Sequence, residues 1–114
     1  MVFILFPIIL RTFAAKKNNS VTDMANNNKR ILVVDDEQDL CEILRFNLET
    51  EGYDVDTADS AEMALTLDIK SYDLLLLDVM MGEMSGFALA KELKKDDATK
   101  DIPIIFLTAR DTEN

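Results

Sequence analysis

A chain of 114 residues has room for one domain with a modest core. Its 22 Asp and Glu residues outweigh 12 Lys and Arg, giving a net charge of −10, which disfavours direct nucleic-acid binding by this segment. The sequence has no histidine and one cysteine, Cys41, which excludes histidine-based sites and an internal disulfide and favours a reducing, cytoplasmic location.

Residues 1–28 differ in composition from the rest of the chain. The first ten, MVFILFPIIL, are nearly all apolar, and a polar, Asn-rich stretch follows them. The apolar run is shorter than the ~20 residues that span a bilayer, and no basic residue precedes it as in a secretory signal. We expect residues 1–28 to be an apolar leader and a polar linker outside the fold, with the natural start at Met24. The alternatives are a signal peptide and a membrane-associating N-terminus.

From Lys29 onward, short apolar runs alternate with amphipathic segments, a pattern typical of βαβ units and a parallel sheet. Residues 31–34 form a β-branched-rich run that predicts a central strand. Residues 37–50 predict a helix, with Gly52 after it as the C-terminal cap. The inward face of this helix is expected to hold Leu40, Ile43, Leu44 and Leu48.

Two strands and a helix are expected in the next segment. Residues 53–58 alternate Tyr, Val and Thr with aspartates, which predicts a half-buried strand nearer an edge of the sheet. Ser60 is the predicted N-cap of a helix over residues 61–70. Residues 74–77 form an unbroken apolar run that predicts the most buried strand.

The last predicted elements are a helix and a strand. Ser85 is the expected cap of a helix that runs to about Lys95, and the segment KKDDATKD at its end predicts a solvated turn. The strand over residues 102–107 contains Pro103, which is tolerated only near the start of a strand. These elements predict an α/β fold, a flavodoxin-like doubly wound parallel sheet of order 2-1-3-4. The inner stripe of the last helix is expected to hold Phe87, Leu89, Ala90 and Leu93.

Polar side chains follow three strands of this sheet at their carboxyl ends. Asp35 and Asp36 follow the first strand, Asp78 follows the third, and Thr108 follows the fourth. Because the first and third strands are neighbours about 4.8 Å apart, the three carboxylates should converge. Carboxylates repel one another unless a hard cation lies among them, and Mg²⁺ fits best. Asp78, alone at the exit of a buried strand, is the natural nucleophile towards phosphorus, and Thr108 can donate to a phosphoryl oxygen.

Three segments, ILVVDDE, LLLLDVMMGEMSG and IIFLTA, resemble the sequence landmarks of bacterial two-component response-regulator receiver domains. The resemblance covers residues 29–114 and includes the spacing between the landmarks. It implies a phosphorelay signalling domain and not an enzyme, with at most self-phosphorylation and autodephosphorylation. It also implies that the phosphoryl donor is a phosphohistidine on a sensor histidine kinase. The segment FLTARDTEN resembles the subgroup with a winged-helix DNA-binding output domain, which implies control of transcription.

The resemblance also assigns a role to each candidate site residue. It implies that Asp78 is the phosphoacceptor and that Asp36 and Asp78 bind Mg²⁺ directly. Asp35 would act through a bound water, and Met80 would supply its backbone carbonyl to the metal. Thr108 would move towards the phosphoryl group after transfer and report its presence.

The sequence departs from the family pattern at two places. Gly82 stands where the family usually has a proline, which should loosen the loop after Asp78. The family's fourth helix, its fifth strand with a phosphate-binding lysine, its aromatic switch residue and its final helix would lie beyond Asn114. We therefore expect a receiver domain truncated before the fifth strand, whose unpaired sheet edge favours a homodimer or pairing with another chain.

Other interpretations of the same residues stay open. Paired aspartates after a strand can simply cap a helix, and Met80, Met81 and Met84 can form a soft interaction surface, although loop packing is favoured. The alternative function is an inactive receiver fragment that acts only as a protein-interaction module. An aspartyl-phosphate phosphatase is disfavoured because Asp78-Val79-Met80 lacks the D-x-D pattern of such enzymes. A nucleotide-binding flavodoxin-like protein is disfavoured because no Gly-rich loop follows the first strand.

Overall fold

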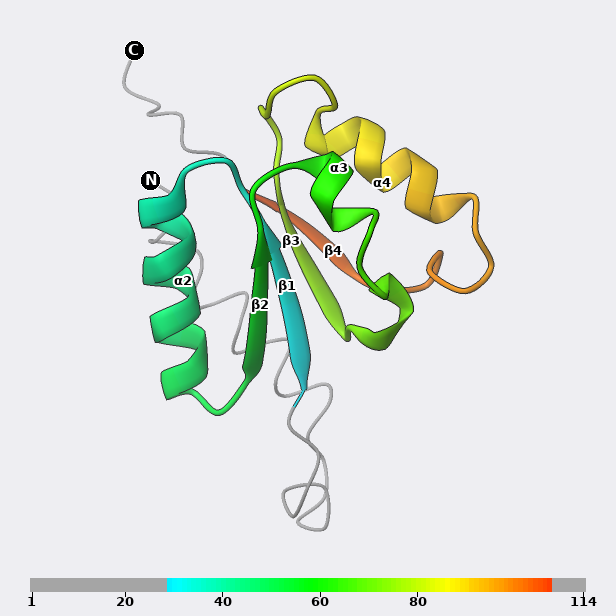
Figure 1. The fold of residues 1–114 in the computed structure, drawn as a ribbon. Coiled ribbons are helices and arrows are strands. Elements are labelled where there is room, and N and C mark those ends of the chain that lie inside the picture. Colours follow the sequence, from blue (N-terminus) through cyan, green and yellow to red (C-terminus); the bar gives the residue numbers. More distant parts are fainter. Residues whose placement is uncertain (1–28, 108–114) are drawn as a thin grey trace, which may run out of the picture. The chain divides into compact units, whose positions relative to one another are not determined.

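The computed structural model describes residues 29–107 (Figure 1). The leader predicted for residues 1–28 and the candidate residue Thr108 lie outside the described residues. No helix within the described part of the chain is long and apolar enough to cross a membrane. The elements in chain order are β1 (Arg30–Val34), α2 (Gln38–Thr50), β2 (Asp54–Ala58), α3 (Ala61–Ala64), η2 (Ile69–Ser71), β3 (Leu74–Asp78), α4 (Gly86–Lys94) and β4 (Ile104–Leu107).

The four strands form one parallel sheet in the order β2-β1-β3-β4, which confirms the predicted order 2-1-3-4. Helix α2 covers one face of the sheet, and α3 and α4 cover the other (Figure 1). In strands β1 and β3, the eight residues 31–34 and 74–77 are all no more than 1% exposed. Continuous apolar runs suit such strands because both faces of each strand contact apolar side chains.

Helix α2 ends where Gly52 adopts a left-handed conformation with φ +100°, as its predicted role of cap requires. The Gly52 amide donates to the Glu49 carbonyl at 3.0 Å, and the next amide donates to Leu48 at 3.1 Å. The prediction of its inward face was wrong for Ile43, which is 48% exposed. Cys41 is buried on that face in its place. The buried residues Cys41, Leu44 and Leu48 follow the spacing of a single helical stripe.

The helix predicted over residues 61–70 is much shorter in the structure and ends at Ala64. Ser60 caps it as predicted, accepting a hydrogen bond from the Met63 amide at 3.0 Å. A tight turn follows, because the Thr66 amide and the Thr66 hydroxyl both donate hydrogen bonds to the Met63 carbonyl, at 3.0 and 2.6 Å. A hydroxyl that bonds its own backbone in this way competes with helix propagation. The shorter helix lets η2 place Ile69 in the core.

Helix α4 begins at the predicted cap, Ser85, whose side chain accepts from the Ala88 amide at 3.1 Å. Its inner stripe was predicted wrongly at Phe87, which is 57% exposed and packs edge-on against Phe106 of β4 with ring centroids 4.7 Å apart. The turn after the helix is mostly exposed, as predicted, except for Thr99. The Thr99 hydroxyl is buried and donates to the Leu93 carbonyl near the end of α4 at 2.6 Å.

Strand β4 starts at Ile104, two residues later than predicted. Pro103 precedes the strand and has no amide to donate, but its carbonyl accepts from the Leu75 amide at 3.0 Å. The strand therefore joins β3 from its first residue without placing the proline inside the ladder.

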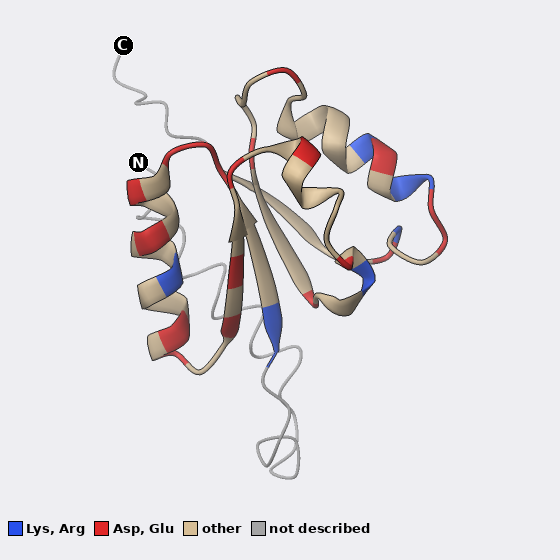
Figure 2. Cartoon of the chain, viewed as in Figure 1, with Lys and Arg blue, Asp and Glu red and all other residues tan. Residues whose placement is uncertain are grey.

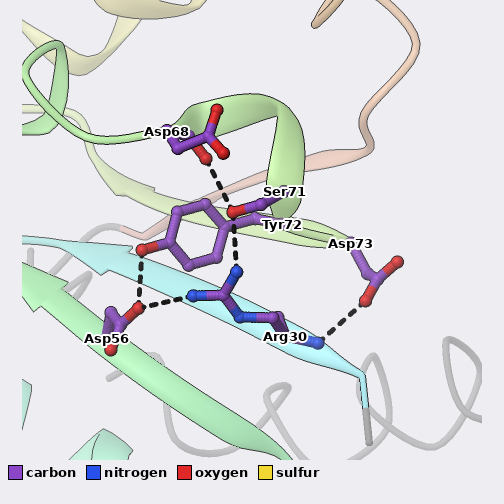
Figure 3. A network of polar contacts seen from close by, with 6 residues as sticks. All are labelled: Arg30, Asp56, Asp68, Ser71, Tyr72 and Asp73. Atoms are coloured by element: carbon purple, nitrogen blue, oxygen red, sulfur yellow. Dashed lines mark hydrogen bonds and ion pairs between the residues drawn. The ribbon is translucent and has the colours of Figure 1, made fainter. Parts of the chain in front are cut away.

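The amino end of the sheet is held by a polar network around Arg30 (Figure 3). The Arg30 guanidinium donates to Asp56 at 3.0 Å and to Ser71 at 2.7 Å, and it lies 4.6 Å from the centre of the Tyr72 ring. The Tyr72 hydroxyl donates to the same Asp56 oxygen at 2.6 Å, and the Arg30 amide donates to Asp73 at 2.8 Å. These contacts join β1, β2 and the segment that leads into β3. They hold β1 and β3 in the register that places the carboxyl ends of the two strands side by side.

Candidate metal centre

Three aspartates meet at the carboxyl end of the sheet, on two neighbouring strands. Asp35 and Asp36 follow the last residue of β1, and Asp78 is the last residue of β3. Val34 and Leu77 are paired in the register of the two strands, so Asp35 lies beside Asp78. One carboxylate oxygen from each aspartate lies within 4.8 Å of the others. The structure thus brings together all three of the acids that the sequence singles out.

Asp35 is the most enclosed of the three, with 2% of its surface exposed. Its Oδ1 accepts from the Glu37 amide at 2.8 Å, and its carbonyl accepts from the Cys41 thiol at 3.3 Å. Burial raises the pKa of Asp35 to about 6; the Glu37 amide opposes this rise, and the nearby charges of Asp78 and Asp36 add to it. Asp35 is therefore a fixed carboxylate in a site where negative charge is unfavourable.

Asp78 is partly exposed and lies at the mouth of the site. Its Oδ1 accepts from the Met80 amide at 3.3 Å, while the Val79 amide donates to the Leu107 carbonyl of β4 at 3.2 Å. Burial raises the pKa of Asp78, and the charge of Asp36 adds to this effect although the two backbone amides oppose it. The carboxylate is thus oriented through one oxygen and has its second oxygen left for a ligand.

The other candidate residues differ in their surroundings. Asp36 is exposed, so its carboxylate can reach a ligand from the solvent side. The Met80 side chain is 76% exposed, whereas Met81 is buried in the core and Met84 packs against it. The predicted packing role thus suits Met81 and Met84 but not Met80. Thr108 is not among the described residues, but Leu107 before it pairs with Asp78 in the sheet.

The electrostatics of the site call for a cation. Within residues 29–107, no Lys or Arg forms an ion pair with Asp35, Asp36 or Asp78. The loop from β1 to α2 is acidic throughout, as Figure 2 shows in red. Oxygen ligands at this density suit a hard divalent ion such as Mg²⁺, which binds through one or two carboxylates and keeps several waters. The raised pKa values of two of the acids are what a carboxylate site shows without its cation.

Sequence reasoning missed one residue beside the site, Gly86 at the start of α4. A Cβ atom built on Gly86 would overlap the carbonyl oxygen of Asp78, so the two backbones are in direct contact. The sequence did contain a sign of this contact. Glycine is an unfavourable residue inside a helix, and the Ser85 cap places Gly86 in the first turn. Its spatial neighbour could not be read from the sequence.

Residues 31–114 match the family model described as the response regulator receiver domain. Over 87 residues the chain is 44% identical to the alkaline phosphatase synthesis transcriptional regulatory protein PhoP of Bacillus subtilis, covering 75% of this chain and 35% of that protein. Over 84 residues it is 42% identical to the response regulator SaeR of Staphylococcus aureus, covering 74% and 36%. The chain thus spans about a third of the length of these relatives.

Solved structures of similar proteins have the same fold. The response regulator TrrA of Thermotoga maritima, in complex with Mg²⁺-BeF, is 47% identical with a TM-score of 0.66, over 72% of this chain and 70% of that one. The chemotaxis protein CheY4 of Vibrio cholerae is 30% identical with a TM-score of 0.69, over 75% and 72%. Family match, identity and fold agree, and the chain belongs to the response-regulator receiver domains of two-component signalling.

Proposed function

We propose that Asp78 accepts a phosphoryl group in a two-component phosphorelay and that Mg²⁺ is bound beside it. The observation that carries this proposal is the meeting of three carboxylates within 4.8 Å, with no basic partner among residues 29–107. Asp36 and Asp78 would bind the ion directly and Asp35 through a water. The Met80 backbone carbonyl would be a third direct protein ligand. The Mg²⁺-BeF complex of TrrA, a protein 47% identical to this chain, supports the choice of ion.

The contacts of Asp78 suit a nucleophile. The Met80 amide orients one carboxylate oxygen, so the other can form the new O–P bond while the P–N bond to a donor imidazole breaks. The imidazole nitrogen keeps the electron pair of that bond, and the product is an acyl phosphate on Asp78. When bound, Mg²⁺ neutralises charge on the transferring group. Thr108, which follows the strand residue paired with Asp78, would donate its hydroxyl to a phosphoryl oxygen.

The partner we propose is a sensor histidine kinase in the cytoplasm, whose phosphohistidine supplies the phosphoryl group. Relatives such as PhoP, named a transcriptional regulatory protein, support transcription as the output of a longer parent protein with a winged-helix DNA-binding domain. The chain's own chemistry would then be limited to self-phosphorylation and autodephosphorylation. Signalling, not turnover of a small substrate, is the function that the site supports best.

Dependence on a divalent ion tests this proposal directly. The chain is incubated with acetyl phosphate in Mg²⁺ and in EDTA, and the intact mass is measured over time. We expect the mass of one phosphoryl group to appear with Mg²⁺, at a rate at least about 100-fold above that in EDTA, because the three acids otherwise repel the anionic donor. Equal labelling with and without the ion would refute the proposed metal site. Absence of labelling under both conditions would favour the alternative of an inactive interaction module.

We also propose that the chain associates through the edge of its sheet. Strand β4 bonds to β3 on one side, and no strand pairs with its other side within residues 29–107. Phe106 on this strand is 38% exposed. An edge with apolar side chains favours pairing with a second copy of the chain. Sedimentation velocity should therefore show a dimer that dissociates on dilution, and a monomer at every concentration would contradict the proposal.

A further inference from the structure

The helix that follows the candidate site begins in contact with the phosphoacceptor strand. A Cβ built on Gly86 would overlap the Asp78 carbonyl oxygen and would lie 2.9 Å from the Asp78 carbonyl carbon and 3.2 Å from the Val79 Cα. All three atoms are backbone atoms, so no side chain can rotate away to make room. Any residue other than glycine would have to move α4 and β3 apart by about 1 Å to restore ordinary contact.

This contact closes the loop that follows Asp78. The Gly86 amide donates to the Val79 carbonyl at 3.0 Å, so the loop leaves and returns at almost the same point. Within the loop, the Met80 amide donates to the Asp78 carboxylate at 3.3 Å. Loop closure and carboxylate orientation therefore depend on the same short stretch of backbone.

The close contact is specific to Gly86 and is not shared by Gly82, the glycine within the loop. A Cβ built on Gly82 would meet no atom within 4 Å. Gly86 lies in the first turn of α4, where almost any other residue would favour the helix more. Its presence there follows from the close approach to Asp78 and not from the needs of the helix or the turn.

We propose that Gly86 is a positioning residue of the Mg²⁺ site. Its contact with the Asp78 backbone holds the loop that carries Asp78 and Met80, the residues that would bind the ion through a carboxylate and a backbone carbonyl. A side chain at this position displaces both ligands together and weakens metal binding. The inference rests on the proposed function, since it takes Asp78 and Met80 as ligands.

The test compares Gly86→Ala with the matched control Gly82→Ala in the 114-residue chain. Mg²⁺ is titrated into each protein, and the dissociation constant is taken from the NMR shifts of backbone amides in residues 35–37 and 78–80. We expect Gly86→Ala to bind Mg²⁺ at least about 10-fold more weakly than the wild type, and Gly82→Ala to stay within about twofold. A merely structural role for Gly86 would lower the melting temperature but leave the metal affinity of the folded protein unchanged. A folded Gly86→Ala with wild-type affinity would overturn the inference.

A measurement on the wild type covers the case in which Gly86→Ala does not fold. Hydrogen exchange of the Gly86 amide is followed with and without saturating Mg²⁺. If the contact holds the metal ligands, the ion stabilises the closed loop and slows this exchange, by about 10-fold at 10 times the dissociation constant. Unchanged exchange at saturation would overturn the inference while leaving the metal site intact. A wild type that shows no response to Mg²⁺ at any amide would instead refute the proposed function, and the inference with it.

Discussion

Asp78→Asn should abolish phosphorylation of the chain by acetyl phosphate, lowering the initial rate at least about 100-fold. An amide oxygen cannot form a stable acyl phosphate, so the substitution removes the nucleophile itself. The change is otherwise small, because asparagine keeps an oxygen that can accept from the Met80 amide as Asp78 Oδ1 does. Intact-mass spectrometry of the two proteins, followed by peptide mapping of the labelled site, measures the effect.

Asp97→Asn provides the matched control for this experiment. Asp97 lies in the turn after α4, and its side chain is 93% exposed, so the same chemical change is made far from the three clustered acids. Labelling of Asp97→Asn should equal that of the wild type. Equal labelling of Asp78→Asn and the wild type would show that another residue takes the phosphoryl group and would sink the assignment of Asp78.

Asp78→Asn also separates the two roles given to this residue. Loss of one of three neighbouring carboxylates relieves repulsion, so the metal-free variant should unfold at a higher temperature than the wild type. Addition of Mg²⁺ should raise the melting temperature of the variant less than that of the wild type, because a direct ligand is lost. An unlabelled variant with an unchanged response to Mg²⁺ would make Asp78 the phosphoacceptor but not a metal ligand.

The sheet and the three acids were predictable because the relevant signals are local. The apolar runs at residues 31–34 and 74–77 define buried parallel strands. Residues that directly follow neighbouring parallel strands lie at the same edge of the sheet. Asp35, Asp36 and Asp78 follow those runs directly, so their meeting depends on strand order alone.

The features that the sequence did not reveal depend on contacts between distant segments or on hydrogen bonds made by individual side chains. Phe87 has the right spacing for the inner face of α4, yet it packs at the rim because Phe106 of β4 offers it an aromatic partner. The helix predicted over residues 61–70 is interrupted where the Thr66 hydroxyl donates a hydrogen bond to the backbone. The spacing of apolar residues along a helix gives no sign of such a bond. The contact of Gly86 with Asp78 joins two elements whose separation only the folded chain fixes.

The pH dependence of stability should distinguish the metal-free protein from the Mg²⁺-bound one. Burial raises the pKa of Asp35 from 3.8 to about 6, so the folded chain holds this proton more tightly than the unfolded chain. The resulting stabilisation is full below about pH 4 and is lost as the pH rises through about 6. Without Mg²⁺, the free energy of unfolding should therefore be about 1–2 kcal/mol higher at pH 5 than at pH 7.5 from this group alone. The raised pKa of Asp78 acts in the same direction.

Asp35→Asn isolates this contribution in urea unfolding experiments at several pH values. The variant keeps an acceptor for the Glu37 amide but has no charge, so without metal it should be more stable than the wild type at pH 7.5 and similar to it at pH 4. Asp97→Asn, exposed and outside the site, should follow the wild type at every pH. Mg²⁺ should reverse the trend in the wild type, since the ion binds the deprotonated site and its stabilising effect fades as the pH falls. A wild type and an Asp35→Asn variant with parallel pH profiles would mean that Asp35 has an ordinary pKa, and the electrostatic case for a cation at this site would lose its main support.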